Sequence, residues 1–335
     1  MLLHIRHETH YHYTPAVENA QHAVHLRPST GNGQIVMQHG LFISPQPEQQ
    51  RDGLDVYGNS KLFFSLQTPH DELEVIADSV VQTHARPAYS TNLAWERVRD
   101  AFRYRAGAEH NSAWEFVFAS SYVPRHEEFT DFAKPSFPPG RPLLEAAHDL
   151  MARIHSAMTY DGESTDVETP ALMALQQGKG VCQDFAHIML AGLRSMGLPA
   201  RYVSGYLLTQ PAPGEVKLVG SDASHAWVSV YVGDLPEGQR WVDLDPTNNR
   251  WGWNAPGVDY VTVATGRDFG DVSPLRGVIH GGASHTLTVG VTVEDIRGDN
   301  NVSAPTAEPA PTSSQTQGQS QSQGGGQSQS QGAIN

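Results

Sequence analysis

The sequence contains one cysteine, Cys182, among 335 residues. A disulfide within the chain is therefore excluded. No stretch approaches the roughly 20 apolar residues that cross a bilayer. The first residues, "MLLHIRHETHYHY", lack the basic and then apolar pattern of a secretory signal. These absences lead us to expect a reduced, cytoplasmic protein without a membrane-spanning segment.

Basic residues are also scarce. The chain has 22 Lys and Arg against 36 Asp and Glu, which gives a formal net charge of -14. Such a surface repels phosphate groups, so we expect neither a nucleic-acid partner nor an anionic membrane surface as partner. The length and the 39% hydrophobic content are enough for a sizeable core and for two domains.

The first part of the chain is rich in short strand-like segments separated by Pro, Gly, Asn and Asp. Examples are "HETHYHYTPAV", "QHAVHLRP", "QIVMQHGLFISP", "SKLFFSLQTP" and "LEVIADSVVQTH". Strands at this spacing predict a β-sandwich domain over residues 1–85. In "DVYGNSKLFF", Gly58 and Asn59 have the residue types favoured at hairpin turn positions with positive φ.

The pattern then changes to helices followed by strands. Helical spacing appears at 94–105 and 141–158, and a third helix is expected to begin near Cys182 and to end at Gly197. Strands follow in "ARYVSGYLLT", "HAWVSVYVG", "QRWVDLDPT" and "HTLTVGVTVEDI". This order favours an α+β fold for residues 86–300, with the Pro-rich stretch before residue 140 on the surface. Residues 301–335, rich in Gln, Ser and Gly, predict a disordered tail.

A lone cysteine has two readings here. Most such residues are small buried packing groups. The alternative is a nucleophile, which requires a histidine and a carboxylate elsewhere in the chain. Cys182 follows Gly180 and Val181 at the start of a predicted helix, where unpaired amides and the helix dipole favour a thiolate and can bind an oxyanion.

Two later strands supply partners for this cysteine. Alternation places His225 and Trp227 on one face of their strand, and Asp243 and Asp245 on one face of the next. A histidine and a carboxylate on neighbouring strands can form the bond that orients an imidazole toward a thiol. The pattern leaves the choice between the two aspartates open, and each of these residues could also be structural.

Three motifs in this order carry a resemblance to a known family. "GVCQDFAHIMLAGLRSMGLPARYVSGY", "HAWVSVYV" and "WVDLDPTNN" resemble the catalytic core of bacterial transglutaminase-like proteins, which are papain-like thiol enzymes. The resemblance is dense over residues 155–250. "HETHYHYTPAV", "LRP" and "DVYGN" resemble the β-rich domain that precedes this core in one bacterial subfamily.

The resemblance implies specific roles for residues. Cys182 corresponds to the nucleophile, His225 to the general base, and Asp245, which directly precedes Pro-Thr, to the orienting carboxylate. Tyr160, Asp243 and Trp227 are further candidates as oxyanion donor or supporting residues. The implied chemistry is attack on an amide carbonyl, with a thioester intermediate that water or an amine resolves.

Other polar residues are not assigned a role in the reaction. His4, His7, His10 and His12 could be read as a metal site, but a solvated strand face is the better interpretation. We expect Asp184 to cap the helix and His187 to be structural. No calcium-loop pattern of the D-x-[DN]-x-[DN]-G kind is present, and we predict no metal and no cofactor.

The sequence therefore predicts an enzyme that acts on a peptide or protein amide. The main hypothesis is a cysteine hydrolase of peptide, isopeptide or side-chain amide bonds, such as a protease or amidase. One alternative is a true transglutaminase that joins Gln side chains to amines. The other is a non-catalytic module that only binds peptides.

Overall fold

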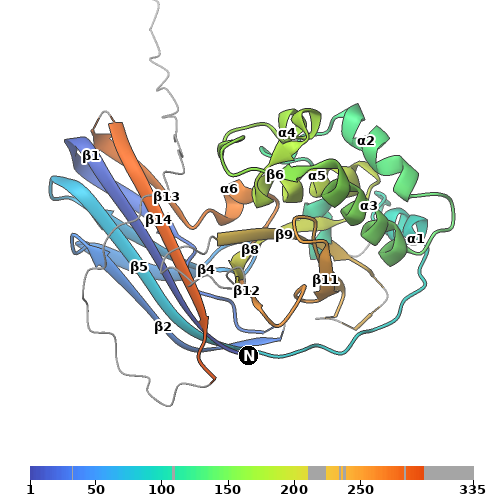
Figure 1. The fold of residues 1–335 in the computed structure, drawn as a ribbon, viewed down its shortest axis with the longest axis horizontal. Coiled ribbons are helices and arrows are strands. Elements are labelled where there is room, and N and C mark those ends of the chain that lie inside the picture. The colour runs from blue at the N-terminus through green and yellow to red at the C-terminus, as the bar shows by residue number, and fades with distance from the viewer. Residues whose placement is uncertain are drawn as a thin grey trace, which may run out of the picture.

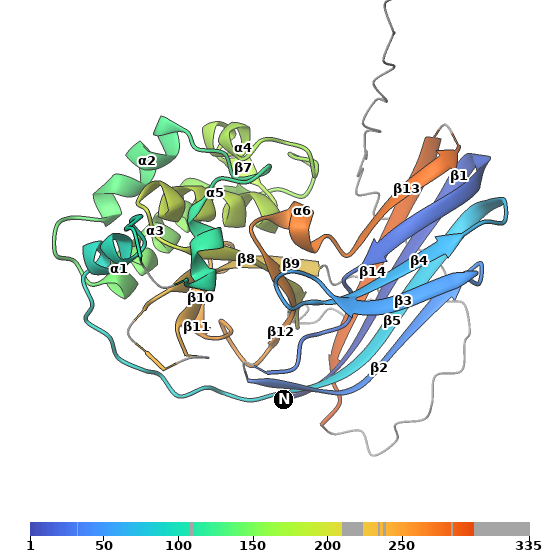
Figure 2. The same cartoon turned by 180° about the vertical axis from the view of Figure 1, so that it is seen from behind.

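The computed structural model describes residues 1–31, 33–107, 110–209, 224–233, 235–236, 239–282 and 284–297. The predicted tail, 301–335, lies outside these residues. Figures 1 and 2 show a long sheet at one side of the molecule, a shorter sheet in the middle and helices at the opposite side. None of the helices in the described residues is both long and apolar enough to cross a membrane.

The N-terminal sheet has seven antiparallel strands in the described chain, in the order β2-β5-β1-β4-β3, with β13 and β14 also paired to β1. Its strands are β1 (Leu2–Val24), β2 (Gln34–Ser44), β3 (Gln49–Leu54), β4 (Ser60–Leu66), β5 (His70–Thr83), β13 (Leu275–Gly281) and β14 (Ser284–Asp295).

A single long strand, β1, makes this sheet curl. Its first half pairs with β5 and β14, and its second half with β4 and β13, with a register shift against β5 between His12 and Val17. Both halves of β1 and the strands paired to them contribute to one apolar cluster, which includes Tyr13 and Val24 of β1, Leu73 of β5 and Phe64 of β4. The two segments predicted as separate strands are therefore one strand, and the two halves of the predicted sandwich are one continuous sheet.

The last two strands lie far from the rest of this sheet in sequence. The predicted final strand at 285–296 is present as β14, and both β13 and β14 pair with β1. The predicted second domain, 86–300, includes residues 275–297, whereas the hydrogen bonds of β13 and β14 join them to the N-terminal sheet. The reason is that strand pairing depends on contacts across the fold, which a linear division of the chain cannot represent.

The second part of the chain begins with helices. They are α1 (Trp95–Ala101), α2 (Glu127–Ala133), α3 (Leu143–Ala157), α4 (Ala171–Gln177), α5 (Cys182–Ser195) and α6 (Phe269–Val272), with 3₁₀ turns at Ser112–Val117 and Lys134–Ser136. The three predicted helices are α1, α3 and α5, and Gly197 ends the last of them at φ 77°. The Pro-rich stretch differs from its prediction because it includes α2, which buries Phe129 and Ala133.

A five-stranded sheet packs against these helices. Its order is β11-β10-β9-β8-β12, and its neighbouring strands are all antiparallel. The strands are β8 (Ala200–Leu207), β9 (Ser224–Tyr231), β10 (Trp241–Asp245), β11 (Arg250–Trp253) and β12 (Tyr260–Gly266). Short parallel strands β6 (Thr159–Tyr160) and β7 (Lys179–Gly180) lie just before α5.

One apolar core joins the two sheets and the helices. Leu3, Ile5 and Val293 of the N-terminal sheet belong to the same buried cluster as Phe185 of α5 and Val228 of β9. The α+β architecture predicted from the sequence, with a β-rich N-terminal part and a helix-and-sheet core, is therefore confirmed.

Candidate active site

Cys182 is the first residue of α5 and is partly exposed. The start of the helix is held by Asp184, whose Oδ2 accepts the backbone N–H of Val181 at 2.8 Å and the hydroxyl of Thr165 at 2.7 Å. This confirms the predicted capping role of Asp184. A Cβ at Gly180 would lie 2.6 Å from the same oxygen, so only glycine permits this close packing. The thiol thus lies at a rigid helix N-terminus with a partial positive charge.

His225 lies near the start of β9, close to Cys182. Its Nε2 donates to Oδ2 of Asp245 at 2.7 Å, so Nδ1 is the ring nitrogen that remains for the thiol. The His225 side chain is 10% exposed. Its ring therefore has a fixed orientation between a carboxylate on one side and the sulfur-bearing helix on the other.

Asp245 ends β10 and is completely buried. Oδ2 accepts hydrogen bonds of 2.7 Å from His225, from the Tyr260 hydroxyl and from Nδ2 of Asn248. Oδ1 accepts the backbone N–H groups of Thr247 at 2.9 Å and Asn248 at 3.2 Å. Burial alone would raise the pKa of Asp245, but the hydrogen bond and the charge of His225, with the other donors, hold it below its usual value.

The pKa of His225 moves in the opposite direction. Burial by itself lowers it, but hydrogen bonds with the side chains of Asp245 and Cys182, together with their negative charges, raise it to about 10. The imidazole is therefore held in its protonated form near neutral pH. A protonated imidazole next to a thiol stabilises the thiolate and can give its proton to a leaving group.

Tyr160 lies beside the thiol. It is in β6, which pairs with β7 directly before Cys182, and it is 53% exposed. Burial and the charge of Cys182 raise the pKa of Tyr160, so its hydroxyl keeps the proton that it could donate. The structure therefore brings this candidate oxyanion donor close to the nucleophile.

Trp227 packs against the His225 imidazole, and Asp243 in turn binds Trp227. The indole Nε1 of Trp227 donates to Oδ2 of Asp243 at 2.9 Å, and its ring centroid is 6.1 Å from that of His225. Burial raises the pKa of Asp243, although a hydrogen bond with Ser229 and the charge of Arg201 oppose this shift. These two residues contact the imidazole only through the Trp227 ring, and they support it rather than pair with it.

Three other histidines singled out in the sequence, His187, His10 and His12, make contacts away from Cys182. His187 is buried in α5, and its Nε2 accepts the backbone N–H of Phe269 at 3.2 Å, which fits the predicted structural role. His10 and His12 share the exposed face of β1, where they approach Glu74 and Glu72 at 3.5 and 3.9 Å. The part of the chain that the structure describes contains no group of three or more His, Cys, Asp or Glu side chains suited to a metal ion.

Sequence reasoning did not identify two residues at this site, Tyr260 and Asn248. Asn248 had a recognisable signal, because an Asn three residues after the carboxylate can bond back to it across a turn. Tyr260 had none. It opens β12, 15 residues after Asp245 in sequence, and reaches the carboxylate only because of the order of the strands in the sheet.

Both parts of the chain match models of known protein families. Residues 130–246 match the model of the transglutaminase-like superfamily, and residues 3–82 match that of the bacterial transglutaminase-like N-terminal region. The chain is 37% identical to the uncharacterized protein Rv2569c of Mycobacterium tuberculosis over 303 residues, which is 88% of this chain and 93% of that protein. It is 31% identical to the uncharacterized protein ML0607 of Mycobacterium leprae, over 86% and 96% of the two chains.

A solved structure shares the whole fold. The crystal structure described as "a Putative Cysteine Protease" from Cytophaga hutchinsonii matches with a TM-score of 0.66 and 18% identity, and it covers 90% of this chain and 92% of that one. At this identity the likeness is one of fold.

Proposed function

Because the chain belongs to the bacterial transglutaminase-like proteins, we propose that it is a thiol-dependent acyl-transfer enzyme. It cleaves peptide, isopeptide or side-chain amide bonds through a thioester on Cys182. The observation that carries this proposal is the Nε2–Oδ2 bond of 2.7 Å between His225 and Asp245, which leaves the other imidazole nitrogen for the sulfur at the helix start.

The first half of the reaction forms the thioester. The sulfur of Cys182 attacks the amide carbonyl carbon, and the negative charge moves to the carbonyl oxygen. The backbone N–H of Cys182, which has no intrahelical acceptor, and the Tyr160 hydroxyl are the proposed donors to that oxygen. The carbon–nitrogen bond then breaks, and His225 gives its proton to the nitrogen, which leaves as an amine or ammonia.

The second half restores the enzyme. His225, now neutral, takes a proton from water, and the resulting hydroxide attacks the thioester carbon. The carbon–sulfur bond breaks, and Cys182 leaves as a thiolate beside the protonated imidazole. The released product is a carboxylic acid. A primary amine in place of water would give a new amide through the same steps.

Substrate and location belong to the same proposal. We propose a peptide or protein as the amide donor, with no nucleic acid and no membrane involved, because the negative charge of the chain disfavours both. We also propose a cytoplasmic location, where a lone thiol nucleophile stays reduced.

Alkylation of the single cysteine tests the nucleophile directly. We expect iodoacetamide at neutral pH to modify Cys182 in the folded protein about tenfold or more faster than in protein unfolded by urea. Equal or slower alkylation of the folded protein would contradict the proposal and favour the non-catalytic peptide-binding module.

Product analysis tests the reaction. With casein as the probe, we expect new amino termini or ammonia from the wild-type protein and none from Cys182→Ala. A fluorescent primary amine is then added. Incorporation of the amine that outpaces hydrolysis would assign the transglutaminase reaction, whereas unchanged hydrolysis would assign the hydrolase.

A further inference from the structure

The five-stranded sheet has an edge strand, β12, whose outer side faces the N-terminal sheet. β12 pairs with β8 on one side only. An edge strand presents unpaired backbone N–H and C=O groups, which are costly to bury without partners. Groups of the N-terminal part of the chain supply partners: two side chains, Gln34 and Asn59, and the backbone N–H of Ser29, which donates to the carbonyl oxygen of Thr262 at 3.1 Å.

Gln34, at the start of β2, pairs with β12 as a neighbouring peptide group would. Its Oε1 accepts the backbone N–H of Thr262 at 2.8 Å, and its Nε2 donates to the carbonyl oxygen of the same residue at 2.7 Å. Gln34 is only 5% exposed, and its Nε2 also donates to the carbonyl of Ser29 at 2.6 Å. The Gln34 carboxamide is therefore held by Thr262 of β12 and by Ser29 of the N-terminal part of the chain.

Asn59 repeats this arrangement further along β12. Its Oδ1 accepts the backbone N–H of Thr265 at 2.8 Å, and its Nδ2 donates to the carbonyl oxygen of Thr265 at 2.8 Å. The side chain is held by Asp55, which accepts from the same Nδ2 at 2.7 Å. Of the two turn positions predicted to have positive φ, Gly58 has that conformation, at φ 84°, and Asn59 does not. Asn59 instead bridges the two sheets.

β12 begins with Tyr260, which contacts the triad carboxylate. Its hydroxyl donates to Asp245 at 2.7 Å, and its ring packs edge-on against Trp227 with centroids 5.4 Å apart. Tyr260 is 1% exposed. Burial and the charge of Asp245 raise the pKa of Tyr260, so its hydroxyl remains a donor.

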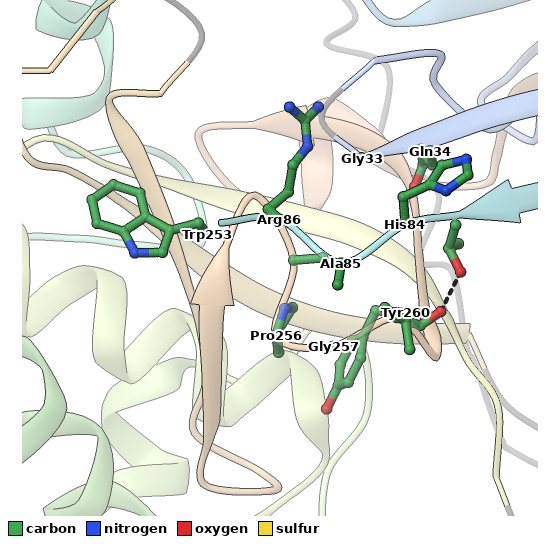
Figure 3. A pocket seen from close by; sticks show the side chains of 12 residues that line it. Gly33, Gln34, His84, Ala85, Arg86, Trp253, Pro256, Gly257 and Tyr260 are labelled. Atoms are coloured by element: carbon green, nitrogen blue, oxygen red, sulfur yellow. Dashed lines mark hydrogen bonds between the residues drawn. The ribbon is translucent and has the colours of Figure 1, made fainter. Parts of the chain in front are cut away.

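Gln34 and Tyr260 both lie at the boundary between the two sheets. They lie on the wall of one pocket of about 180 Å³, together with Arg86 from the chain after β5 and Gly257 from the loop before β12 (Figure 3). In the same seam the Thr83 hydroxyl donates to the carbonyl of Val258, which also fixes the approach to β12. The position of Tyr260 thus depends on groups that the N-terminal sheet provides.

We propose that the N-terminal sheet is part of the positioning machinery of the active site: Gln34 and Asn59 fix β12, and β12 holds Tyr260 as the positioning residue that orients Asp245 toward His225. This inference rests on the proposed function of Cys182, His225 and Asp245. It gives the N-terminal sheet a task in the reaction beyond that of a scaffold.

The test compares Tyr260→Phe and Gln34→Met with two matched controls. Tyr104→Phe removes a hydroxyl from a side chain that is 90% exposed, and Gln38→Met makes the same change as Gln34→Met at an exposed position of the same strand. For each variant, kcat and KM on casein and the pH dependence of Cys182 alkylation by iodoacetamide are measured. Thermal unfolding reports whether each variant is folded at the assay temperature.

We expect Tyr260→Phe to lower kcat about tenfold with little change in KM, because one hydrogen bond to a charged group is lost. Since the Tyr260 bond helps to hold the pKa of Asp245 low, its removal raises that pKa. The acid limb of the alkylation profile therefore moves to higher pH. Gln34→Met is expected to give the same changes at about a third of the size, and both controls are expected to match the wild type.

Two results would overturn the inference. One is wild-type kcat and an unmoved acid limb in Tyr260→Phe. The other is a folded Gln34→Met protein with a lower melting temperature but wild-type kcat and pH profile, which would make the N-terminal sheet a scaffold only. Because alkylation requires no amide substrate, the inference remains testable if casein is not cleaved. If Cys182 in the folded wild-type protein reacts no faster than Cys182 in the unfolded protein, the proposed function itself is contradicted.

Discussion

His22 is buried and the His225 side chain is only 10% exposed, but their surroundings give the two rings opposite charge states. His22 lies in the N-terminal sheet, is 4% exposed and has no hydrogen-bond partner for either ring nitrogen in the described part of the chain. Burial and the neighbouring His70 lower its pKa to about 4. At His225 the same cost of burial is outweighed by a carboxylate and a thiol, and the pKa rises to about 10.

This difference shows that burial alone does not decide the charge state of a histidine. In the N-terminal sheet, β1 places His22 against Phe64, with ring centroids 4.9 Å apart, and the ring serves as an apolar packing group. In the five-stranded sheet, the neighbouring strand β10 places the carboxylate of Asp245 at 2.7 Å from His225, near the start of β9. The charged partner turns an interior histidine into a proton donor.

The largest expected effect comes from removing the sulfur. Cys182→Ala is expected to abolish amide cleavage, a loss of about a thousandfold or more, because the thioester cannot form. The assay is ammonia or amino-terminus release from casein, with thermal unfolding as the control for folding. Wild-type activity in this variant would place the reaction elsewhere in the molecule.

Asp245→Asn should reduce the difference in pKa between His225 and His22. The amide keeps the shape of the carboxylate but loses its charge, so the pKa of His225 falls and kcat drops about a hundredfold. The active pH range then ends at lower pH, because the imidazole that must protonate the leaving amine loses its proton earlier. The measurement is the basic limb of kcat/KM against pH. A basic limb identical to that of the wild type would show that Asp245 does not set the charge of His225.

The sequence identified the three residues that the structure brings together at this site better than it identified the residues that support them. Cys182, His225 and Asp245 each lie in a local motif, so a linear reading finds them. The bond from Tyr260 to Asp245 depends on the strand order β11-β10-β9-β8-β12, which places β12 at an edge that no local pattern reveals. The same reason explains the assignment of β13 and β14, whose pairing with β1 spans more than 250 residues of sequence.

His22 is expected to make the protein sensitive to acid. Its pKa in the folded state, about 4, is below the ordinary value of 6.5, so the unfolded chain binds more protons as the pH falls. Stability is therefore lost between about pH 6.5 and pH 4, and His22 alone accounts for roughly 2 kcal/mol at pH 5. His22→Met should reduce the loss of melting temperature between pH 7 and pH 5. An unchanged pH dependence would mean that this ring does not titrate on unfolding.

The smallest expected effect comes from two exposed histidines of β1, His10 and His12. His10 and His12 lie opposite Glu74 and Glu72, but their side chains are 46% and 58% exposed. Water and salt screen such pairs, and ordering the long glutamate side chains opposes the gain. The double variant His10→Ala, His12→Ala is therefore expected to change the free energy of unfolding by less than about 0.5 kcal/mol and to leave kcat unchanged. Urea unfolding at low and high salt measures this. A loss of about 2 kcal/mol or more would contradict this expectation and show that the exposed pairs contribute to stability as strongly as a buried charge-assisted hydrogen bond does.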